Sequence, residues 1–155
     1  MTSKVNPIPA GYTTVTPYLV MQNAAEALEF YKKAFNAVEN FRMPMPNGNI
    51  GHAELKIGNS MVMMADECPE MSFYGPKKFG GSPVSLHLYV DNVDEWFKRA
   101  ITAGGKEIKP VADQFYGDRM GMLQDPFGHM WTLSTHVEDL TMEEITKRKD
   151  AMFSV

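Results

Sequence analysis

The sequence predicts an α+β fold in which one βαβββ module occurs twice. A C-terminal helix follows the two modules. Two observations predict this fold: an internal repeat at an offset of 69 residues, and an Asp-Pro-Phe-Gly-His turn at 125–129 before the last strand-like run. The 155 residues, 44% hydrophobic and 22% charged, are enough for a single soluble domain over 1–155.

The first module is predicted at residues 12–66. It begins with a strand-like run at 13–21, where Pro17 indicates a free edge or a bulge. Asn23 is placed to cap a helix whose apolar residues recur with a 3.6-residue period as far as Phe35. Three more strands are expected, at 37–43, 49–57 and 61–65, and turn residues separate them.

The second module is predicted at residues 83–136 and repeats this order. A strand at 84–90 precedes Asn92, which lies 69 residues after Asn23. Leu28 and Phe97 have the same separation on the apolar faces of the two helices. Strands at 106–111, 119–124 and 130–135 complete the module. A shared cap and a shared apolar face at one offset indicate an internal duplication.

Two segments lie outside the modules. Residues 67–82 have no periodicity and several Gly and Pro residues, which predicts a connecting loop. The tail at 137–155 contains Thr141 and Glu144 in a capping-box pattern, which predicts a helix to about Phe153. Few of its residues are apolar, so we expect a peripheral or subunit-contacting helix.

Composition excludes several classes of function. The net charge of −4 comes from interspersed residues, so a nucleic-acid partner is not expected. No apolar run approaches the length that spans a membrane, and residues 1–11 lack a run of signal-peptide length. The single cysteine, Cys68, is typical of a reducing compartment, so we expect a cytoplasmic protein.

Several short runs resemble one superfamily. They are Thr16-Pro17-Tyr18-Leu19, the Glu-Phe-Tyr-Lys-Lys-Ala-Phe run at 29–35, His52-Ala53-Glu54-Leu55, Ala65-Asp66-Glu67 and the Asp-Gln-Phe-Tyr-Gly-Asp-Arg run at 113–119. With the turn at 125–129, they resemble the vicinal oxygen chelate superfamily, which includes glyoxalase I, bleomycin-resistance proteins, fosfomycin-resistance enzymes and extradiol dioxygenases. The closer resemblance is to its PhnB-like branch. It covers about residues 10–148. It implies that the mixed sheets of the two modules are curled and form a cup with ligands inside, and that the protein is a homodimer.

The resemblance also implies where a metal would bind. Metal-dependent members place His or Gln on the first strand of a module and Glu on its last strand. The matching positions here are about Thr16 and Ser85 on the first strands, and Val62 and Thr132 on the last strands. None of the four has the imidazole, thiolate or carboxylate donor that a divalent metal needs. We therefore predict no metal and no other cofactor.

Strand alternation predicts which side chains line the cup, since every second residue points to the same face. The predicted ligand-binding residues are His52, Glu54, His87, Tyr89, Tyr116, Met120, Met122, Met130 and Thr132. All are placed on inward strand positions except Tyr116, which lies in a loop at the mouth. An apolar lining with a few polar groups is typical of a small-molecule site.

The titratable residues leave alternatives open. His52 and Glu54 are either a pair for general-base chemistry or a polar pair on a wet strand face. His87 is either a pocket residue or a core histidine bonded to a backbone carbonyl. Combined, the three make a two-histidine, one-carboxylate site for Zn, Ni, Mn or Fe.

Three function hypotheses follow from these alternatives. The first is a protein that binds a small organic molecule without metal. The second is a glyoxalase- or dioxygenase-type enzyme that uses the metal on His52, Glu54 and His87. The third is a scaffold whose pocket is only core. No catalytic residue is assigned.

Residues near the 125–129 turn have structural predictions. We expect Asp125 to cap the turn with its side chain, His129 to fix it, and Trp131 to pack under a helix on the side away from the cup. Arg119 is predicted to pair with Asp118 or Asp125, with an anion clamp as the alternative.

Overall fold

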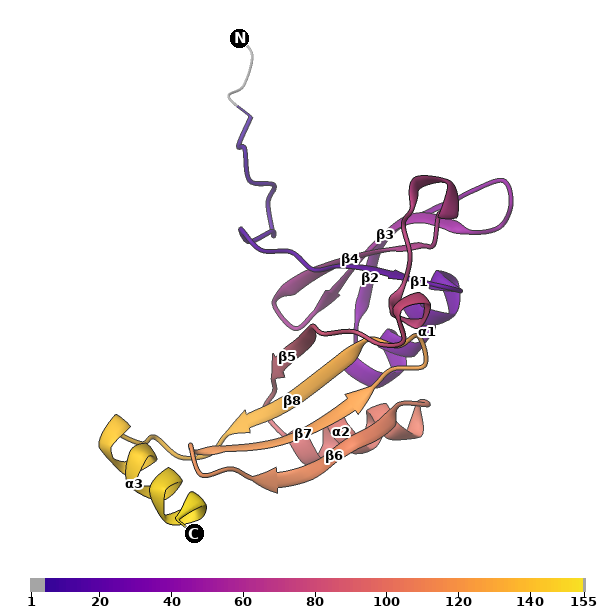
Figure 1. Ribbon diagram of the computed structural model, residues 1–155. Helices are drawn as coiled ribbons and strands as arrows, with labels where there is room; N and C mark the ends of the chain where they lie inside the picture. Colours follow the sequence, from indigo (N-terminus) through magenta and orange to yellow (C-terminus); the bar gives the residue numbers. More distant parts are fainter. Residues whose placement is uncertain (1–4, 155) are drawn as a thin grey trace. The chain divides into compact units, whose positions relative to one another are not determined.

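A computed structural model describes residues 5–154 (Figure 1). Residues 1–4 and 155, the two ends of the predicted single domain, lie outside the described part. The chain divides between Gly81 and Ser82 into two compact units. Each unit has the predicted βαβββ order, so the α+β fold class is confirmed.

In the first unit, one helix and four strands follow the predicted order. They are β1 Tyr18–Met21, α1 Ala24–Phe35, β2 Val38–Pro44, β3 Ile50–Ile57 and β4 Ser60–Asp66. The sheet has the order β1-β4-β3-β2, with β1 parallel to β4 and the other pairs antiparallel. The strand predicted over 13–21 begins only at Tyr18. Just before it, the Pro17 carbonyl accepts a hydrogen bond from Met63 N.

The second unit has the same arrangement. Its elements are β5 Ser85–Tyr89, α2 Val93–Thr102, β6 Lys106–Asp113, β7 Asp118–Gln124, β8 Met130–His136 and the additional helix α3 Met142–Phe153. The sheet has the order β5-β8-β7-β6, and β5 is parallel to β8. The parallel registers agree: Tyr18 lies beside Met63, and His87 lies beside Thr132, with equal separations along the chain.

One face of each sheet packs against the helix of its own unit. Helix α1 contacts β2, β3 and β4, and α2 contacts β6, β7 and β8. Gly121 on β7 marks the helix-facing side, because a Cβ there would lie 2.9 Å from the Phe97 ring of α2. On the same face, Trp131 is fully buried, as predicted. The helix faces therefore hold the core of each unit.

The two helices begin differently. Asn92 accepts a hydrogen bond from Glu95 N, so it caps α2 as predicted. Asn23 does not cap α1 with its side chain; its backbone is left-handed, with φ 61°. Asp66 from the end of β4 accepts the hydrogen bond from Ala24 N instead, at 2.9 Å. The prediction that Asn23 caps α1 is therefore wrong, because a distant carboxylate takes that role.

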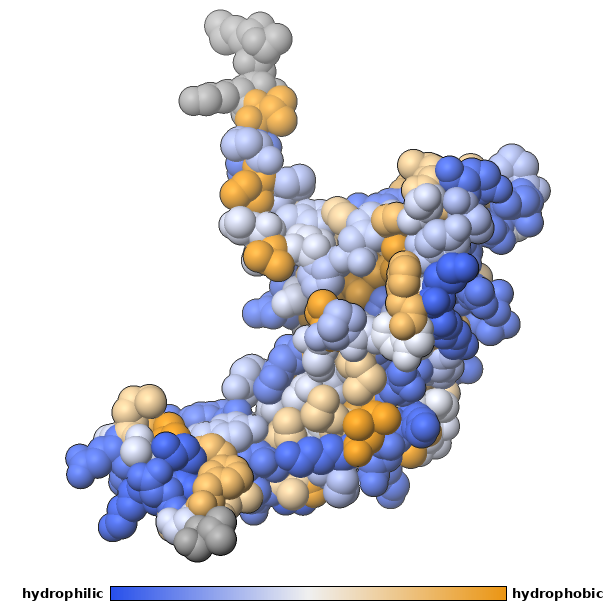
Figure 2. All heavy atoms as spheres, in the orientation of Figure 1, coloured by the Kyte–Doolittle hydropathy of each residue, from blue (hydrophilic) through white to orange (hydrophobic). Residues whose placement is uncertain are grey.

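The segments outside the modules contain further short elements. The connecting loop includes the 3-10 helices η1 Pro69–Met71 and η2 Pro76–Phe79. Helix α3 begins with the predicted Thr141–Glu144 capping box and buries none of its side chains. Exposed apolar side chains occur on α3 and along the N-terminal segment, among largely hydrophilic neighbours (Figure 2). Within residues 5–154, no helix is both long and apolar enough to cross a lipid bilayer.

Candidate functional site

The face of each sheet opposite its own helix is called its open face. Strand pairing assigns the side chains to it, since directly paired residues lie on the same face. In the second unit, the open face includes Ser85, His87, Tyr89, Met120, Met122, Gln124, Met130, Thr132 and Ser134. Six of the predicted ligand-binding residues therefore share one sheet face: His87, Tyr89, Met120, Met122, Met130 and Thr132.

Hydroxyl groups and an imidazole form the polar part of the second open face. The Ser85 and Thr132 hydroxyls are hydrogen-bonded at 2.9 Å. His87 Nε2 lies 2.8 Å from the Ser134 hydroxyl, and the His87 ring stacks on Tyr89 with ring centroids 4.8 Å apart. His87 is also exposed. It is therefore not the buried core histidine of the alternative prediction.

A buried carboxylate lies at the edge of the same face. Asp118 is 4% exposed and accepts hydrogen bonds from the Tyr89 hydroxyl at 2.8 Å and from His136 Nδ1 at 2.7 Å. The other ring nitrogen of His136 lies 2.9 Å from Asp139. The hydrogen bonds to Asp118 and Asp139 raise the pKa of His136. The Asp118 hydrogen bond also raises the pKa of the Tyr89 phenol.

Tyr116 lies in the loop before β7, as predicted. Burial and the charge of Asp118 raise its pKa, and Tyr116 in turn contributes to the raised pKa of Tyr89. Its ring makes an edge-to-face contact with Phe115, with centroids 5.2 Å apart. Tyr116 therefore lies close to the Tyr89–Asp118 end of the second open face.

The open face of the first unit carries the predicted His52–Glu54 pair. His52 Nε2 and Glu54 Oε1 are 3.3 Å apart, so the two side chains are neighbours as expected from their spacing. The Tyr18 hydroxyl lies 3.0 Å from His52 Nδ1. Interactions with Tyr12 and then His52 lower the pKa of the Glu54 carboxyl.

Aromatic rings surround this pair. The His52 ring centroid lies 5.5 Å from that of Tyr18 and 6.4 Å from that of Phe41, and Tyr18 makes an edge contact with Phe73 at 5.8 Å. Met63 on β4 pairs with Tyr18 on one side and with Glu54 on the other. The first open face is therefore an aromatic surface with one imidazole and one carboxylate.

One prediction about the last strands needs correction. Val62 pairs with Leu55, whose side chain is buried against α1, so Val62 lies on the helix face and cannot line a cup. Met63 takes the position that corresponds to Thr132. The cause is a difference in turn length: two residues separate the paired Ile57 and Ser60, whereas three separate Asp125 and His129, which are joined by a backbone hydrogen bond.

The turn of the second unit is held by Asp125, as predicted. Its Oδ1 accepts hydrogen bonds from Phe127 N and His129 N, both at 2.9 Å, and its Oδ2 accepts one from Trp131 Nε1. Arg119 does not pair with Asp118 or Asp125. It bonds to Asp94 at the start of α2 and to Asp113 on β6, because its side chain points to the helix face.

Several residues of these surfaces were not predicted from the sequence. Tyr12 and Tyr18 join the first open face, and Asp118 and His136 join the second. Alternation provides the signal for two of them, since Asp118 lies two residues before Met120 and His136 lies two after Ser134. The place of Tyr18 on the first open face is known only from the pairing of β1 with β4, which puts Tyr18 beside Met63. Tyr12 precedes the first strand, so no periodicity marks it.

The donor set does not suit a divalent metal. Ser85 and Thr132 offer two hydroxyls, and Met63, the first-unit counterpart of Thr132, offers a thioether, whereas such metals prefer imidazole, thiolate or carboxylate ligands. His52 and Glu54 lie on the first unit and His87 on the second. Within the described part of the chain, no group of three or more His, Cys, Asp or Glu side chains is arranged to hold a metal ion.

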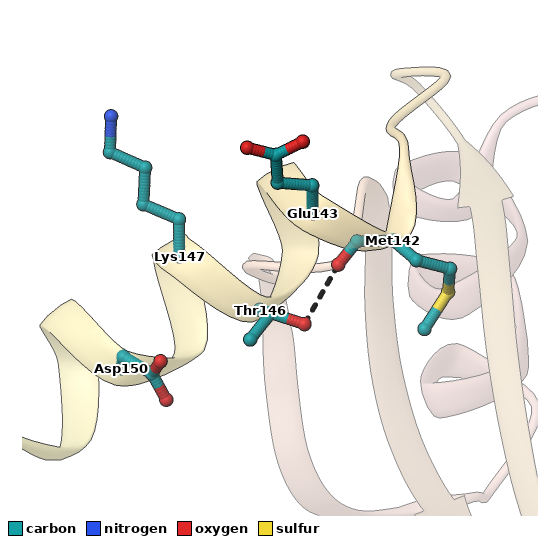
Figure 3. A pocket seen from close by; sticks show the side chains of 5 residues that line it. All are labelled: Met142, Glu143, Thr146, Lys147 and Asp150. Atoms are coloured by element: carbon teal, nitrogen blue, oxygen red, sulfur yellow. Dashed lines mark hydrogen bonds between the residues drawn. The ribbon is translucent and has the colours of Figure 1, made fainter.

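An open hollow at α3 is a weaker candidate. Its lining residues all come from this one helix: Met142, Glu143, Thr146, Lys147 and Asp150. Their side chains project from the helix rather than converge, and the Thr146 hydroxyl donates a hydrogen bond to the Met142 carbonyl of the same helix (Figure 3). A small-molecule site needs convergent groups on several sides. We therefore place the candidate site on the open faces of the sheets.

Comparison with known proteins identifies the family. Residues 12–133 match the Glyoxalase/Bleomycin resistance protein/Dioxygenase superfamily, and the protein belongs to it. An uncharacterized protein from Mycobacterium bovis is 44% identical over 134 residues, which cover 84% of this chain and 88% of that protein.

Solved structures share the fold. TioX from Micromonospora sp. ML1 matches with a TM-score of 0.65 and 27% identity, over 81% of this chain and 99% of TioX. A PhnB protein from Bacillus cereus matches with a TM-score of 0.64 and 19% identity, over 79% of this chain and 99% of its own.

Proposed function

We propose that this protein binds a small organic molecule on its open sheet faces, without the metal that many members of the superfamily use. The observation that carries the proposal is the Ser85–Thr132 hydroxyl pair. The resemblance implies metal ligands at these two positions, and the two side chains are hydrogen-bonded to each other at 2.9 Å. Met130 and Met122 lie beside them on the face, and Tyr89 lies further along β5; these side chains suit an organic ligand.

We assign the protein to the PhnB-like branch of the superfamily as part of this proposal. The ordered runs at 16–19, 29–35, 52–55, 65–67 and 113–119 support the assignment. The fold shared with the Bacillus cereus PhnB protein agrees with it.

Thermal-shift screening of a metabolite and antibiotic set tests the binding proposal, since a ligand that binds only the folded state raises the melting temperature. A hit should be confirmed by loss of the shift in Tyr89→Ala and Met122→Ala variants. Met142→Ala, an exposed change on α3, serves as the control. A set in which no compound changes the melting temperature contradicts the proposal.

Metal analysis tests the second hypothesis, an enzyme with a divalent metal on His52, Glu54 and His87. Protein purified without chelators should contain no stoichiometric Zn, Ni, Mn or Fe. Stoichiometric metal that disappears in the His52→Ala, His87→Ala double variant would overturn the metal-free proposal.

A further inference from the structure

The first open face combines a negative charge with aromatic surface. Glu54 is bonded to the His52 imidazole, Tyr18 and Phe41 lie beside that imidazole, and Phe73 lies beside Tyr18. Three of these rings remain accessible: Tyr18 is 42% exposed, Phe41 46% and Phe73 41%. Aromatic faces and carboxylates both attract cations, the first through the ring quadrupole and the second through charge.

Among the described residues, no lysine or arginine forms an ion pair with Glu54. Its neighbours are Tyr12 and His52, whose Nε2 lies 3.3 Å from Glu54 and whose Nδ1 lies 3.0 Å from the Tyr18 hydroxyl. Lys56 lies two residues further along the same face. Within residues 5–154, no ion pair joins Lys56 to Glu54. The face therefore presents a carboxylate that no lysine or arginine of the described chain neutralises.

Tyr12 adds an independent observation. Its hydroxyl oxygen is buried, and within residues 5–154 no N–H or O–H group donates a hydrogen bond to it. Burial, and then the interaction of the hydroxyl with the adjacent Glu54 carboxylate, raise the pKa of Tyr12 to about 12, so the phenol stays protonated. A buried polar atom without a partner costs free energy unless a ligand or water supplies one. An N–H group bound to Glu54 would be close enough to donate to Tyr12 as well.

We propose that the first open face binds the ammonium group of an organic cation. Glu54 neutralises the charge, the Tyr12 oxygen accepts an N–H bond, and the rings of Tyr18, Phe41 and Phe73 contact the carbon atoms beside the nitrogen. This inference rests on the proposed function, which it deepens by naming the class of ligand: a primary or secondary amine, protonated at neutral pH, on an apolar body.

Four small probes separate charge, hydrogen bonding and apolar contact: benzylammonium, benzyltrimethylammonium, benzyl alcohol and benzoate. Carbon-13-labelled methionine methyls report where each binds. Met63 lies between Tyr18 and Glu54 on the first open face, and Met122 lies on the second. Benzylammonium should shift Met63 and bind about 10-fold more tightly than benzyl alcohol. Benzoate should bind more weakly than either.

Two variants test the roles of the polar groups. Glu54→Gln should abolish the preference for the cation over the alcohol, whereas Glu26→Gln, an exposed change on α1, should keep it. Tyr12→Phe should weaken the binding of benzylammonium about 5-fold, which is the contribution expected of one hydrogen bond. The binding of benzyltrimethylammonium should stay unchanged, because this ion has no N–H group. Circular dichroism of each variant verifies that the fold is kept.

The outcomes distinguish this inference from the proposed function. Benzyl alcohol binding as tightly as benzylammonium at Met63, or a cation preference that survives Glu54→Gln, overturns the ammonium site. If screened compounds then still raise the melting temperature and shift Met122, the small-molecule function stands and only the ammonium site fails. If no compound shifts either methionine or the melting temperature, both fail.

Discussion

On the open face of the first unit a histidine and a glutamate lie among aromatic rings, whereas the second has hydroxyls, thioethers and a buried aspartate at its edge. The strands beneath are equivalent, since Tyr18–Met63 and His87–Thr132 occupy the same place in the parallel register. The duplicated backbone therefore fixes where side chains point but not what they are. The two faces have therefore diverged in the chemical groups that each presents.

The largest expected difference lies beneath the faces, in the cores. Trp131 and Val62 occupy corresponding helix-facing positions, and both are buried. Trp131→Ala should reduce the free energy of unfolding by about 3–5 kcal/mol, because it leaves a large cavity. Val62→Ala removes two carbon atoms and should cost about 1–2 kcal/mol.

Urea denaturation measures this difference unit by unit. Both tryptophans, Trp96 and Trp131, belong to the second unit, so fluorescence reports on that unit while far-ultraviolet circular dichroism reports on the whole chain. Val62→Ala should change the circular dichroism transition and leave the fluorescence transition in place. Equal shifts of both signals in Val62→Ala would show that the two units unfold together.

The start of each helix provides the second comparison. Asp66 accepts hydrogen bonds from Ala24 N and Ile50 N, so Asp66→Ala leaves two backbone donors unpaired and should cost about 2 kcal/mol. In the second unit the Thr135 hydroxyl accepts from Val93 N, and Asn92 supplies an additional cap. Thr135→Ala should therefore cost only about 1 kcal/mol. Thermal melts of the two variants would contradict this order if Thr135→Ala were the less stable protein.

The tyrosines of the open faces differ in the charge of their acceptors. Tyr89 donates to the buried Asp118 carboxylate, whereas Tyr18 bonds to an imidazole nitrogen. Hydrogen bonds to charged groups are the stronger ones, so Tyr89→Phe should cost about 1.5 kcal/mol and Tyr18→Phe about 0.5 kcal/mol. The midpoints of urea unfolding at pH 7 check the prediction, when the slope of the unfolding free energy against urea concentration is the same in both variants. A Tyr18→Phe variant as unstable as Tyr89→Phe would mean that the charge of Asp118 adds nothing.

The smallest effects are expected in the pH dependence of stability, and they have opposite signs. The pKa of His136 is raised above 6.5 by Asp118 and Asp139, so its contribution is complete below 6.5 and is lost as the pH rises through the folded value. The pKa of Glu54 is lowered below 4.5, so its contribution is complete above 4.5 and is lost as the pH falls.

Variants that cannot titrate isolate these two contributions. Relative to the wild type, His136→Gln should lose the decline of stability above pH 6.5, and Glu54→Gln should lose part of the decline below pH 4.5. Urea unfolding from pH 4 to pH 8 measures both. An unchanged slope above pH 6.5 in His136→Gln would show that the imidazole bonds equally well in its neutral form.

The sequence predicted the fold because its signals are local. Apolar periods and turn residues identified both helices and every strand, and the capping box at Thr141 identified the start of α3. The cap of α1 was missed, since Asp66 lies 42 residues from Ala24 and no local pattern links them. Val62 was misplaced because the second turn is one residue longer, and a fixed repeat offset does not reveal a change in turn length.

The candidate site was predicted less completely than the fold. Alternation brought His87, Tyr89 and the methionines to one face, because a strand has a strict two-residue period. It did not reveal that His136 and Asp118 meet, since that contact depends on the register between β7 and β8. Nor did it reveal Tyr12, whose place beside Glu54 depends on the path of the chain before β1.

The carboxylate of Asp66 has a consequence for folding order. Asp66 is the last residue of β4, and its carboxylate accepts hydrogen bonds from the backbone N–H groups of the first residue of α1 and the first residue of β3. Contacts between residues far apart in sequence form slowly, because a long loop must close first. Helix α1 therefore gains its N-terminal hydrogen bond only when β4 joins the sheet. We expect the first helix to be frayed at its start in the folding transition state, and Asp66→Ala to speed unfolding more than it slows folding.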